Sequence, residues 1–245
     1  MKAQSEACKK SYGKTHAELN TKAQTKRSMG AQTGAQTRAP EKANTLEDAN
    51  ADKPIEIEIR NLMQSDLDCY VFWFHPNREF HQFNGPYYGR KSETELTEFV
   101  EYLRRAFLNG EENPYPQKKM IVNRETDELI GQVSWYWKSQ ETLWLEIGVV
   151  IFNENYWGHG IGYRALTLWT EELFTQMPEL ARLGLTTWSG NFRMMHLAEK
   201  LGFVKEAVYR KARIVEGQYY DSISYGILRE EWDVIKSSEN KRVKV

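Results

Sequence analysis

Three glycines within five positions, where a buried strand gives way to a helix, constrain this chain more than any other feature. They are Gly158, Gly160 and Gly162. Apolar residues at every fourth position from Ile161, ended by Pro178, predict a helix over about residues 160–176. The preceding TLWLEIGVVIF, residues 142–152, is rich in β-branched and aromatic residues and predicts a buried strand. This order directs unpaired N–H groups at an anion such as a phosphate, although the glycines could equally make a tight turn that lets the helix pack closely.

The overall composition argues against several classes of partner. Lys and Arg number 33 against 34 Asp and Glu, so no global field favours nucleic acid or an acidic membrane. The longest apolar run, IGVVIF, is too short to span a bilayer, and the first 50 residues hold no signal-peptide block. Cys8 and Cys69 are the only cysteines, which argues against a disulfide framework. We therefore expect a cytoplasmic protein with no nucleic-acid and no membrane partner.

The first 53 residues differ from the rest of the chain. They contain no Ile, Val, Phe or Trp, and the triplet AQT occurs three times. Such a segment buries too little apolar surface to offset its ordering entropy, so residues 1–53 are predicted to be a disordered polar and basic tail. Its basic first part could serve as a docking arm or simply be solvated. We expect the folded domain over residues 54–235 and a flexible charged C-terminus over residues 236–245.

The folded part alternates helical and strand patterns. QSDLDCYVFWFH and SETELTEFVEYLRRAFL predict helices, the second with a capping box formed by Ser92 and Glu95. KKMIVNRETDELIGQVSWYWK predicts a hairpin, and FVKEAVYRKARIVEGQYYDSISYGIL a second one that turns at Glu216–Gly217. A strand at ARLGLTTW and a helix at FRMMHLAEKLG lie between them. The predicted fold class is α/β, with a mixed twisted sheet, flanking helices and one central βαβ unit.

The glycine loop matches neither of the common nucleotide-binding motifs. No Lys-Ser or Lys-Thr pair follows the glycines, so it is no P-loop, and Gly160-Ile161-Gly162 lacks the third glycine of a dinucleotide fingerprint. Together with the downstream SGNFRMMHLAEKLGFVKEAVYRKARIVEGQYYDSISYGILREEW, however, EIGVVIFNENYWGHGIGYRAL resembles the GNAT family of acetyl-CoA-dependent N-acetyltransferases. The likeness covers about residues 54–233 and is closest to the ribosomal-protein N-terminal acetyltransferase branch.

The resemblance implies a single GNAT-like domain with a splayed central strand pair. It also implies acetyl-CoA as co-substrate, with no metal, and transfer of an acetyl group to a primary amine. A protein N-terminal amine is the leading acceptor; a polyamine or antibiotic amine, or a coenzyme A-binding module without turnover, are the alternatives. We expect a monomer or a homodimer.

The family's pyrophosphate signature, [Q/R]-x-x-G-x-[G/A], falls on residues 157–162, with a tryptophan at its first position. The backbone there must approach phosphate oxygens to about 3 Å, which side chains at the last two glycines would prevent. The family's pantetheine arm pairs with the strand before the loop as an extra strand would. Asn191 could bind coenzyme A or only cap a helix. The implied coenzyme A site comprises Val150, Ile151, Phe152, Trp157, Gly158, His159, Gly160, Ile161, Gly162 and Asn191.

Glu146 is the candidate catalytic residue. A carboxylate between Leu145 and Ile147 in mid-strand should face a cleft or a partner. It stands 14 positions before Gly160 (160 − 146), where acetyltransferases with a strand glutamate as general base carry theirs. The alternative is a structural salt bridge at a sheet edge. Gly148 suggests a β-bulge that splays the strand, or close packing under a tryptophan.

The sequence gives weaker candidates for the proton donor and for the residues that contact the acceptor. The family's proton donors to the leaving thiolate, a tyrosine or a serine, fall on Ala198 and Met194. His159 has no nearby ligand set for a metal. Asp221 could bind a cationic acceptor or be only an exposed strand carboxylate. The aromatic cluster FWFHPNREFHQFNGPYYG should roof the acceptor site, and its candidate contacts, or core residues, are Trp73, His75, Phe80 and Tyr87.

Overall fold

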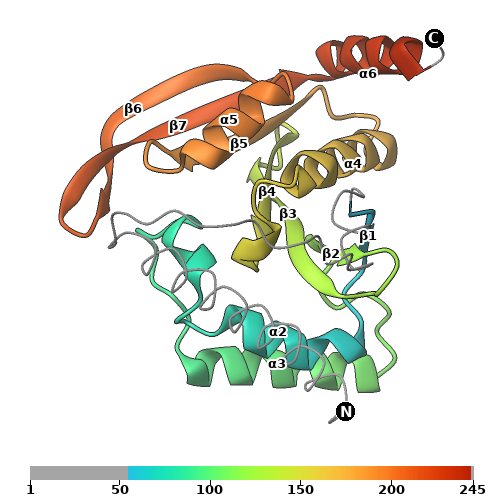
Figure 1. Cartoon of the computed structure of the whole chain (residues 1–245), viewed down its shortest axis with the longest axis vertical. Helices are drawn as coiled ribbons and strands as arrows, with labels where there is room; N and C mark the ends of the chain where they lie inside the picture. Colours follow the sequence, from blue (N-terminus) through green and yellow to red (C-terminus); the bar gives the residue numbers. More distant parts are fainter. Residues whose placement is uncertain (1–54, 244–245) are drawn as a thin grey trace, which may run out of the picture. The chain divides into compact units, whose positions relative to one another are not determined.

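The computed structural model describes residues 55–243, which form a seven-stranded sheet with flanking helices (Figure 1). The strands are β1 (Ile57–Arg60), β2 (Lys118–Asn123), β3 (Leu129–Ser139), β4 (Trp144–Ile151), β5 (Arg182–Trp188), β6 (Val204–Val215) and β7 (Gln218–Leu228). The α-helices are α2 (Leu67–Phe74), α3 (Glu93–Leu108), α4 (Ile161–Gln176), α5 (Phe192–Lys200) and α6 (Arg229–Val243). Short 3₁₀ turns occupy Gln64–Asp66, Glu79–Gln82 and Glu154–Tyr156.

The sheet is mixed, in the order β1-β2-β3-β4-β5-β7-β6, and its one parallel pair is β4 with β5. Helix α4 connects these two strands, so the predicted central βαβ unit is confirmed. Their recorded pairing ends at Glu146 opposite Gly184, although β4 continues to Ile151 and β5 to Trp188. The two strands therefore part beyond Glu146, as expected of a splayed central pair, and the backbone groups that face the gap are left for a ligand.

Local sequence signals placed the turns and caps correctly. Ser92 accepts a hydrogen bond from the N–H of Glu95, whose carboxylate accepts the N–H of Ser92, so α3 begins with the predicted capping box. The β6–β7 turn has positive φ at Glu216 (49°) and Gly217 (77°), as a two-residue hairpin turn requires. The β2–β3 hairpin likewise turns between Asn123 and Leu129.

The helices attach to different parts of the sheet. α2 and α3 pack against each other, and α4 packs against β1, β3 and β4 (Figure 1). α5 lies against β5 and β6, beside the long β6–β7 hairpin. The indole of the buried Trp169 on α4 donates to the carbonyl of Ser134 on β3 at 3.1 Å, which fixes the central helix on the strand next to β4.

The structure departs from the sequence-based expectations at Gly148 and near the C-terminus. The bulge predicted at Gly148 is not found: Gly148 pairs in register with Ser134, and the β3–β4 register shifts at Trp137/Ser139 instead. A Cβ at Gly148 would lie 3.2 Å from the Ser134 hydroxyl, and no tryptophan atom of the described residues lies within 4 Å of that position. Helix α6 continues through residue 243, past the expected boundary at residue 235. The predicted tail, residues 1–53, lies outside the described residues.

Candidate active site

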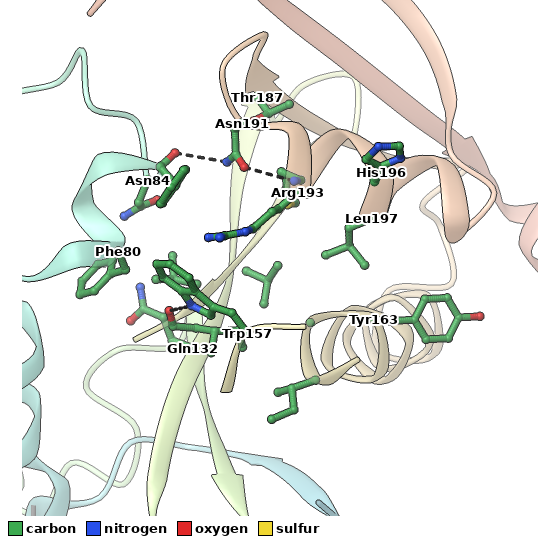
Figure 2. Close-up of a pocket in the computed structure, with 18 of the residues that line it drawn as sticks. Phe80, Asn84, Gln132, Trp157, Tyr163, Thr187, Asn191, Arg193, His196 and Leu197 are labelled. Carbon is green, nitrogen blue, oxygen red and sulfur yellow. Dashed lines mark hydrogen bonds between the residues drawn. The ribbon is translucent and has the colours of Figure 1, made fainter. Parts of the chain in front are cut away.

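A cavity of about 620 Å³ occupies the place where β4 and β5 part. Its lining comes from the ends of both strands, the glycine loop, the first turn of α4, α5 and residues 80–87 (Figure 2). We call this cavity the glycine cleft. Sequence segments that are more than a hundred residues apart thus meet at one opening, which the splay of the central strands creates.

The glycine loop gives the cleft an open backbone at the mouth of α4. Gly158 and Gly160 have φ of +84° and +72°, a left-handed conformation that favours glycine. No described atom lies within 4 Å of the Cβ position at either residue, so the space beside the loop is clear. The first hydrogen bond of the helix runs from the N–H of Arg164 to the carbonyl of Gly160 at 3.1 Å, which leaves the preceding N–H groups of the turn outside the helical ladder.

Gly162 contributes in a different way. A side chain at this position would lie 3.3 Å from a Leu197 methyl group on α5, which lines the cleft opposite. Its backbone conformation is one that any residue can adopt, so the glycine matters here for space alone. Two features make the whole glycine loop suitable for a coenzyme A pyrophosphate. Its backbone is open to the cleft, and it stands at the positive end of the α4 dipole.

Eight of the ten residues expected to bind coenzyme A line the glycine cleft: Val150, Ile151, Trp157, Gly158, Gly160, Ile161, Gly162 and Asn191. Phe152 and His159 do not. The Phe152 ring is buried 5.1 Å from that of Phe74 and 5.5 Å from that of Phe80, and its N–H donates to the carbonyl of Ile130. The side chain of His159 is exposed on the loop. The residue after β4 therefore turns into the aromatic core instead of the cleft.

Trp157 stands where the family signature has Gln or Arg, and its indole donates to the carbonyl of Ile151 at 3.0 Å. The guanidinium of Arg193 on α5 lies 4.3 Å from the centre of the Trp157 ring and 4.9 Å from that of Phe83. Figure 2 shows Arg193 reaching from α5 across the cleft toward Trp157. The first signature position thus has no cation, but Arg193 brings one into the cleft from α5 and stacks on the rings of Trp157 and Phe83.

Asn191 is the N-cap of α5. Its side-chain oxygen accepts the N–H of Met194 at 3.1 Å, and its amide donates to the carbonyl of Phe83 at 3.2 Å (Figure 2). The oxygen therefore caps α5 itself, and the amide ties the start of α5 to Phe83. At the two positions where the family has a proton donor to the thiolate, neither Ala198, which is buried, nor Met194 has an acidic proton.

Glu146 is a buried carboxylate with hydroxyl partners. It is 2% exposed and accepts hydrogen bonds from the Tyr136 hydroxyl and from Thr186 Oγ1, the latter at 2.9 Å. The ammonium of Lys138 lies 3.8 Å from Oε1. Burial, followed by the hydrogen bond and charge of Glu146, raises the pKa of Tyr136, so its hydroxyl stays protonated at neutral pH. Because β4 is a central strand, Glu146 does not lie at a sheet edge, although its contact with Lys138 is an ion pair, as the alternative expected.

The two residues whose hydroxyls donate to Glu146, Tyr136 and Thr186, each line a cavity. Thr186 lines the glycine cleft and also a second cavity of about 450 Å³, whose lining includes Tyr136. We call this second cavity the basic chamber. It shares Tyr87, Lys118 and Gly148 with the glycine cleft, so the two spaces adjoin along β3 and β4. Glu146 itself lines neither space and contacts them through its partners.

The four expected acceptor contacts separate into two groups. Phe80 lines the glycine cleft and Tyr87 lines both spaces. Trp73 is buried in the core, with its ring stacked 6.1 Å from Phe152. His75 Nε2 is hydrogen-bonded to Glu93 Oε1 at 2.9 Å, away from both spaces. Asp221 likewise has a structural partner, because it accepts the N–H of Lys211 at 2.8 Å across the β6–β7 hairpin.

Sequence reasoning missed four residues of this site: Tyr136, Thr186, Arg193 and Arg213. Each lies on a strand or helix outside the glycine loop, and its position in the sequence alone gave it no role. Strand pairing would have found Tyr136, a cross-strand neighbour of Glu146, and would have pointed to Thr186, which is two residues beyond the other neighbour, Gly184. The described residues hold no cluster of His, Cys, Asp or Glu that could bind a metal ion. None of their helices is long and apolar enough to cross a membrane.

Comparison with known proteins agrees with this geometry. The family model described as "Acetyltransferase (GNAT) domain" matches residues 56–204, and the chain belongs to this family. It is 30% identical over 135 residues to the uncharacterized N-acetyltransferase YnaD of Bacillus subtilis strain 168. The matched segment covers 55% of this chain and 78% of YnaD. It is therefore an acyltransferase of the GNAT class, and a coenzyme A-dependent reaction follows from the family.

Solved structures resemble it in fold. The ribosomal-protein-S5-alanine acetyltransferase of Vibrio fischeri superposes with a TM-score of 0.55 at 19% identity, covering 72% of this chain and 94% of that one. The spermidine N-acetyltransferase of Vibrio cholerae, solved with CoA and spermine, superposes with a TM-score of 0.57 at 20% identity, covering 72% and 97%. Their named acceptors differ, so the shared fold leaves the acceptor open.

Proposed function

We propose that this protein transfers the acetyl group of acetyl-CoA to a primary amine, and that a protein N-terminal amine is its acceptor. One observation carries the proposal: the open glycine loop at the mouth of α4 lines the same cleft as Thr186, a hydroxyl partner of Glu146, and the other partner, Tyr136, lines the adjoining cavity. A cleft that only bound coenzyme A would have no need of a buried carboxylate behind these hydroxyls, where burial is costly.

The residues present fit acetyl-CoA. The backbone of the glycine loop and the first turn of α4 would hold the pyrophosphate, with Arg193 as the nearby cation. The cleft edge of β4 at Val150 and Ile151 would lie along the pantetheine arm. Bound acetyl-CoA supplies the activated acyl group as a thioester.

Glu146 would be the general base. An amine attacks only when neutral, and an α-amine with a pKa near 8 or a lysine-like amine near 10.4 is largely protonated at pH 7. Because Glu146 lines neither space, we propose that the amine proton reaches it through the Tyr136 hydroxyl, which passes its own proton to the carboxylate. Thr186 holds the other carboxylate oxygen in place.

The absence of a tyrosine or serine at positions 198 and 194 favours one second candidate, a coenzyme A-binding module without turnover. Unassisted departure of the thiolate is tolerable, since a thiol pKa near 8.5 makes it a fair leaving group. The two candidates differ in whether coenzyme A is released.

A coenzyme A-release assay with a panel of N-terminal peptides, polyamines and aminoglycosides separates the candidates. We expect release with peptides, confirmed by a mass increase of one acetyl group on the terminal amine. Release with polyamines or aminoglycosides alone would overturn the peptide assignment. Tight acetyl-CoA binding in calorimetry without release on any amine would establish the binding module instead.

A further inference from the structure

The basic chamber owes its name to its charge. Five cationic side chains line it, and among its described lining residues there is no aspartate or glutamate. They are Arg90, Lys91, Lys118, Lys138 and Arg213. Among the described residues, Lys138 lies 3.8 Å from the carboxylate of Glu146, and Lys91 interacts with that of Glu95. Arg90, Lys118 and Arg213 form no ion pair within the described part of the chain, so the chamber has a positive potential focused by its aromatic walls.

Arg213 is built into this chamber by an irregularity of the β6–β7 hairpin. The register shifts between Tyr209 and Arg213, where Lys211 has a φ of +56° and its N–H is held by Asp221. The guanidinium of Arg213 lies 4.5 Å from the centre of the Tyr87 ring. Its Nε is buried without a hydrogen-bond partner among the described residues, which is costly unless a ligand meets the group.

Lys118 lies where the two cavities adjoin, because it lines both. Its ammonium is 4.9 Å from the centre of the Tyr115 ring and 5.9 Å from that of Phe74. No described carboxylate pairs with it. Lys118 and Arg213 therefore present free positive charge on aromatic supports, beside the hydroxyl of Tyr136.

These cations are not explained by acetyl-CoA. No residue of the glycine loop or of α4 lines the basic chamber, so its charges are separate from the pyrophosphate cradle. Four of them, Arg90, Lys91, Lys138 and Arg213, are absent from the lining of the glycine cleft altogether. The chamber therefore offers its charge to a molecule other than acetyl-CoA.

We propose that the acceptor carries a carboxylate close to its reacting amine, and that Arg213 and Lys118 bind this carboxylate. The inference rests on the proposed acetyl transfer and narrows its acceptor to acidic N-terminal segments or amino acids. A polyamine would bring only positive charge into a chamber that already has an excess of it. The same cations favour the neutral form of the amine, which is the form that attacks.

Two peptides that differ only in charge test this inference. Both begin with alanine, followed by two acidic residues in one and by two lysines in the other; free L-glutamate and spermidine complete the set. For the native chain we expect kcat/KM on the acidic peptide to exceed that on the lysine peptide about 10- to 100-fold, the range of one hydrogen bond to a charged group. Glutamate turnover would show that a free amino acid suffices, and its absence that the carboxylate belongs to a peptide.

Arg213→Ala should lower kcat/KM on the acidic peptide by a similar factor, mainly through KM. It should not lower kcat/KM on the lysine peptide, which loses a repelling charge, and it should leave the KM for acetyl-CoA unchanged. Arg213→Lys should restore part of the loss. Arg210→Ala is the matched control, because it removes the same charge from the same strand. Arg210 is exposed and lines neither cavity. Added salt should narrow the preference for the acidic peptide.

Equal or faster turnover of the lysine peptide or spermidine would overturn the carboxylate assignment while leaving acetyl transfer intact. An unchanged preference in a folded Arg213→Ala variant would likewise overturn the role of Arg213. Acetyl-CoA binding without turnover of any of the four acceptors would reject the proposed function, and this inference with it. The melting temperature of each variant shows whether it is folded.

Discussion

Replacing Glu146 by glutamine tests the proposed base, because the change removes proton affinity and keeps the size of the side chain. The glutamine oxygen can accept the Tyr136 hydroxyl, as the carboxylate does. Its NH₂ group then faces Thr186 Oγ1, which can accept it and still donate to Ser224 Oγ at 3.1 Å. The neighbouring hydroxyls therefore rotate to satisfy the amide, and we expect the domain to remain folded.

The expected loss of stability is small. Hydrogen bonds to a charged group contribute about 1.5–3 kcal/mol and neutral ones about 0.5–1.5 kcal/mol, so two weakened bonds cost at most about 3 kcal/mol. Removing a buried charge offsets part of this cost. The half-exposed Lys138 at 3.8 Å adds little. At about 2–4 °C for each kcal/mol in a domain of this size, a cost of about 3 kcal/mol would lower the melting temperature by about 6–12 °C, and the offset reduces this fall.

The expected loss of turnover is much larger. A positioned acid–base group contributes roughly 10²–10⁴-fold, so coenzyme A release by Glu146→Gln should fall by that factor. Acetyl-CoA affinity should stay the same, because the phosphate cradle is backbone. Raising the pH should partly restore the rate, since a larger fraction of the amine is then neutral without help.

The measurement is a pH–rate profile of coenzyme A release by the native chain and by Glu146→Gln, on one N-terminal peptide and one lysine-like amine. The deficit should be smaller for the α-amine, whose pKa near 8 leaves more of it neutral at pH 7 than a pKa near 10.4 does. Indistinguishable profiles for the two proteins would refute the base assignment and leave Glu146 a structural carboxylate.

Four further outcomes are expected. Gly162→Val should abolish calorimetric acetyl-CoA binding in a folded domain by filling the turn beside the cleft, and near-native affinity would remove the loop from the site. Gly131→Ala should destabilise the domain by about 1–3 kcal/mol in denaturant titrations, because its Cβ would collide with the backbone carbonyl of Val150, whereas Gly89→Ala, with open space around it, should cost far less; equal costs would contradict the packing. Burial, followed by the charge of a nearby guanidinium, lowers the pKa of His81, so the folded state binds fewer protons than the unfolded one; stability should fall as the pH drops below about 6.5, less so in His81→Phe, and an unchanged slope would contradict this. Deleting residues 1–52 should leave the melting temperature and acetyl-CoA affinity unchanged, because the segment is so poor in apolar residues, and a drop of several degrees would show otherwise.

The features that sequence predicted well depend on residues close together in the chain. The capping box of Ser92 and Glu95 spans one helical turn. The turn at Glu216–Gly217 needs two adjacent residues with positive φ. The glycine loop is equally local, since Gly158 and Gly160 adopt backbone angles that other residues strongly disfavour. Elements of this kind are set by steric and hydrogen-bonding preferences within a few residues, which any chain carries in its sequence.

The features that sequence missed or misplaced depend on contacts between distant residues. Phe152 and Trp73 looked like site residues by their position, yet their rings pack against each other in the core. Arg193 enters the cleft from α5 and lies over Trp157, although no spacing relates the two. Aromatic side chains bury large areas wherever the fold brings them together, so their sequence neighbourhood does not determine which of them face a ligand.

By itself the sequence determined the kind of protein: a strand, a glycine loop and a helix in a GNAT domain, where we propose a backbone anion site. The tertiary structure decided which side chains surround it. The proposed role of Glu146 depends on β3 and β5, which bring the hydroxyls of Tyr136 and Thr186 to it, and the irregular β6–β7 hairpin brings Arg213 to the basic chamber. A local motif fixes backbone geometry, whereas the chemistry of a cleft depends on which distant strands are paired beside it.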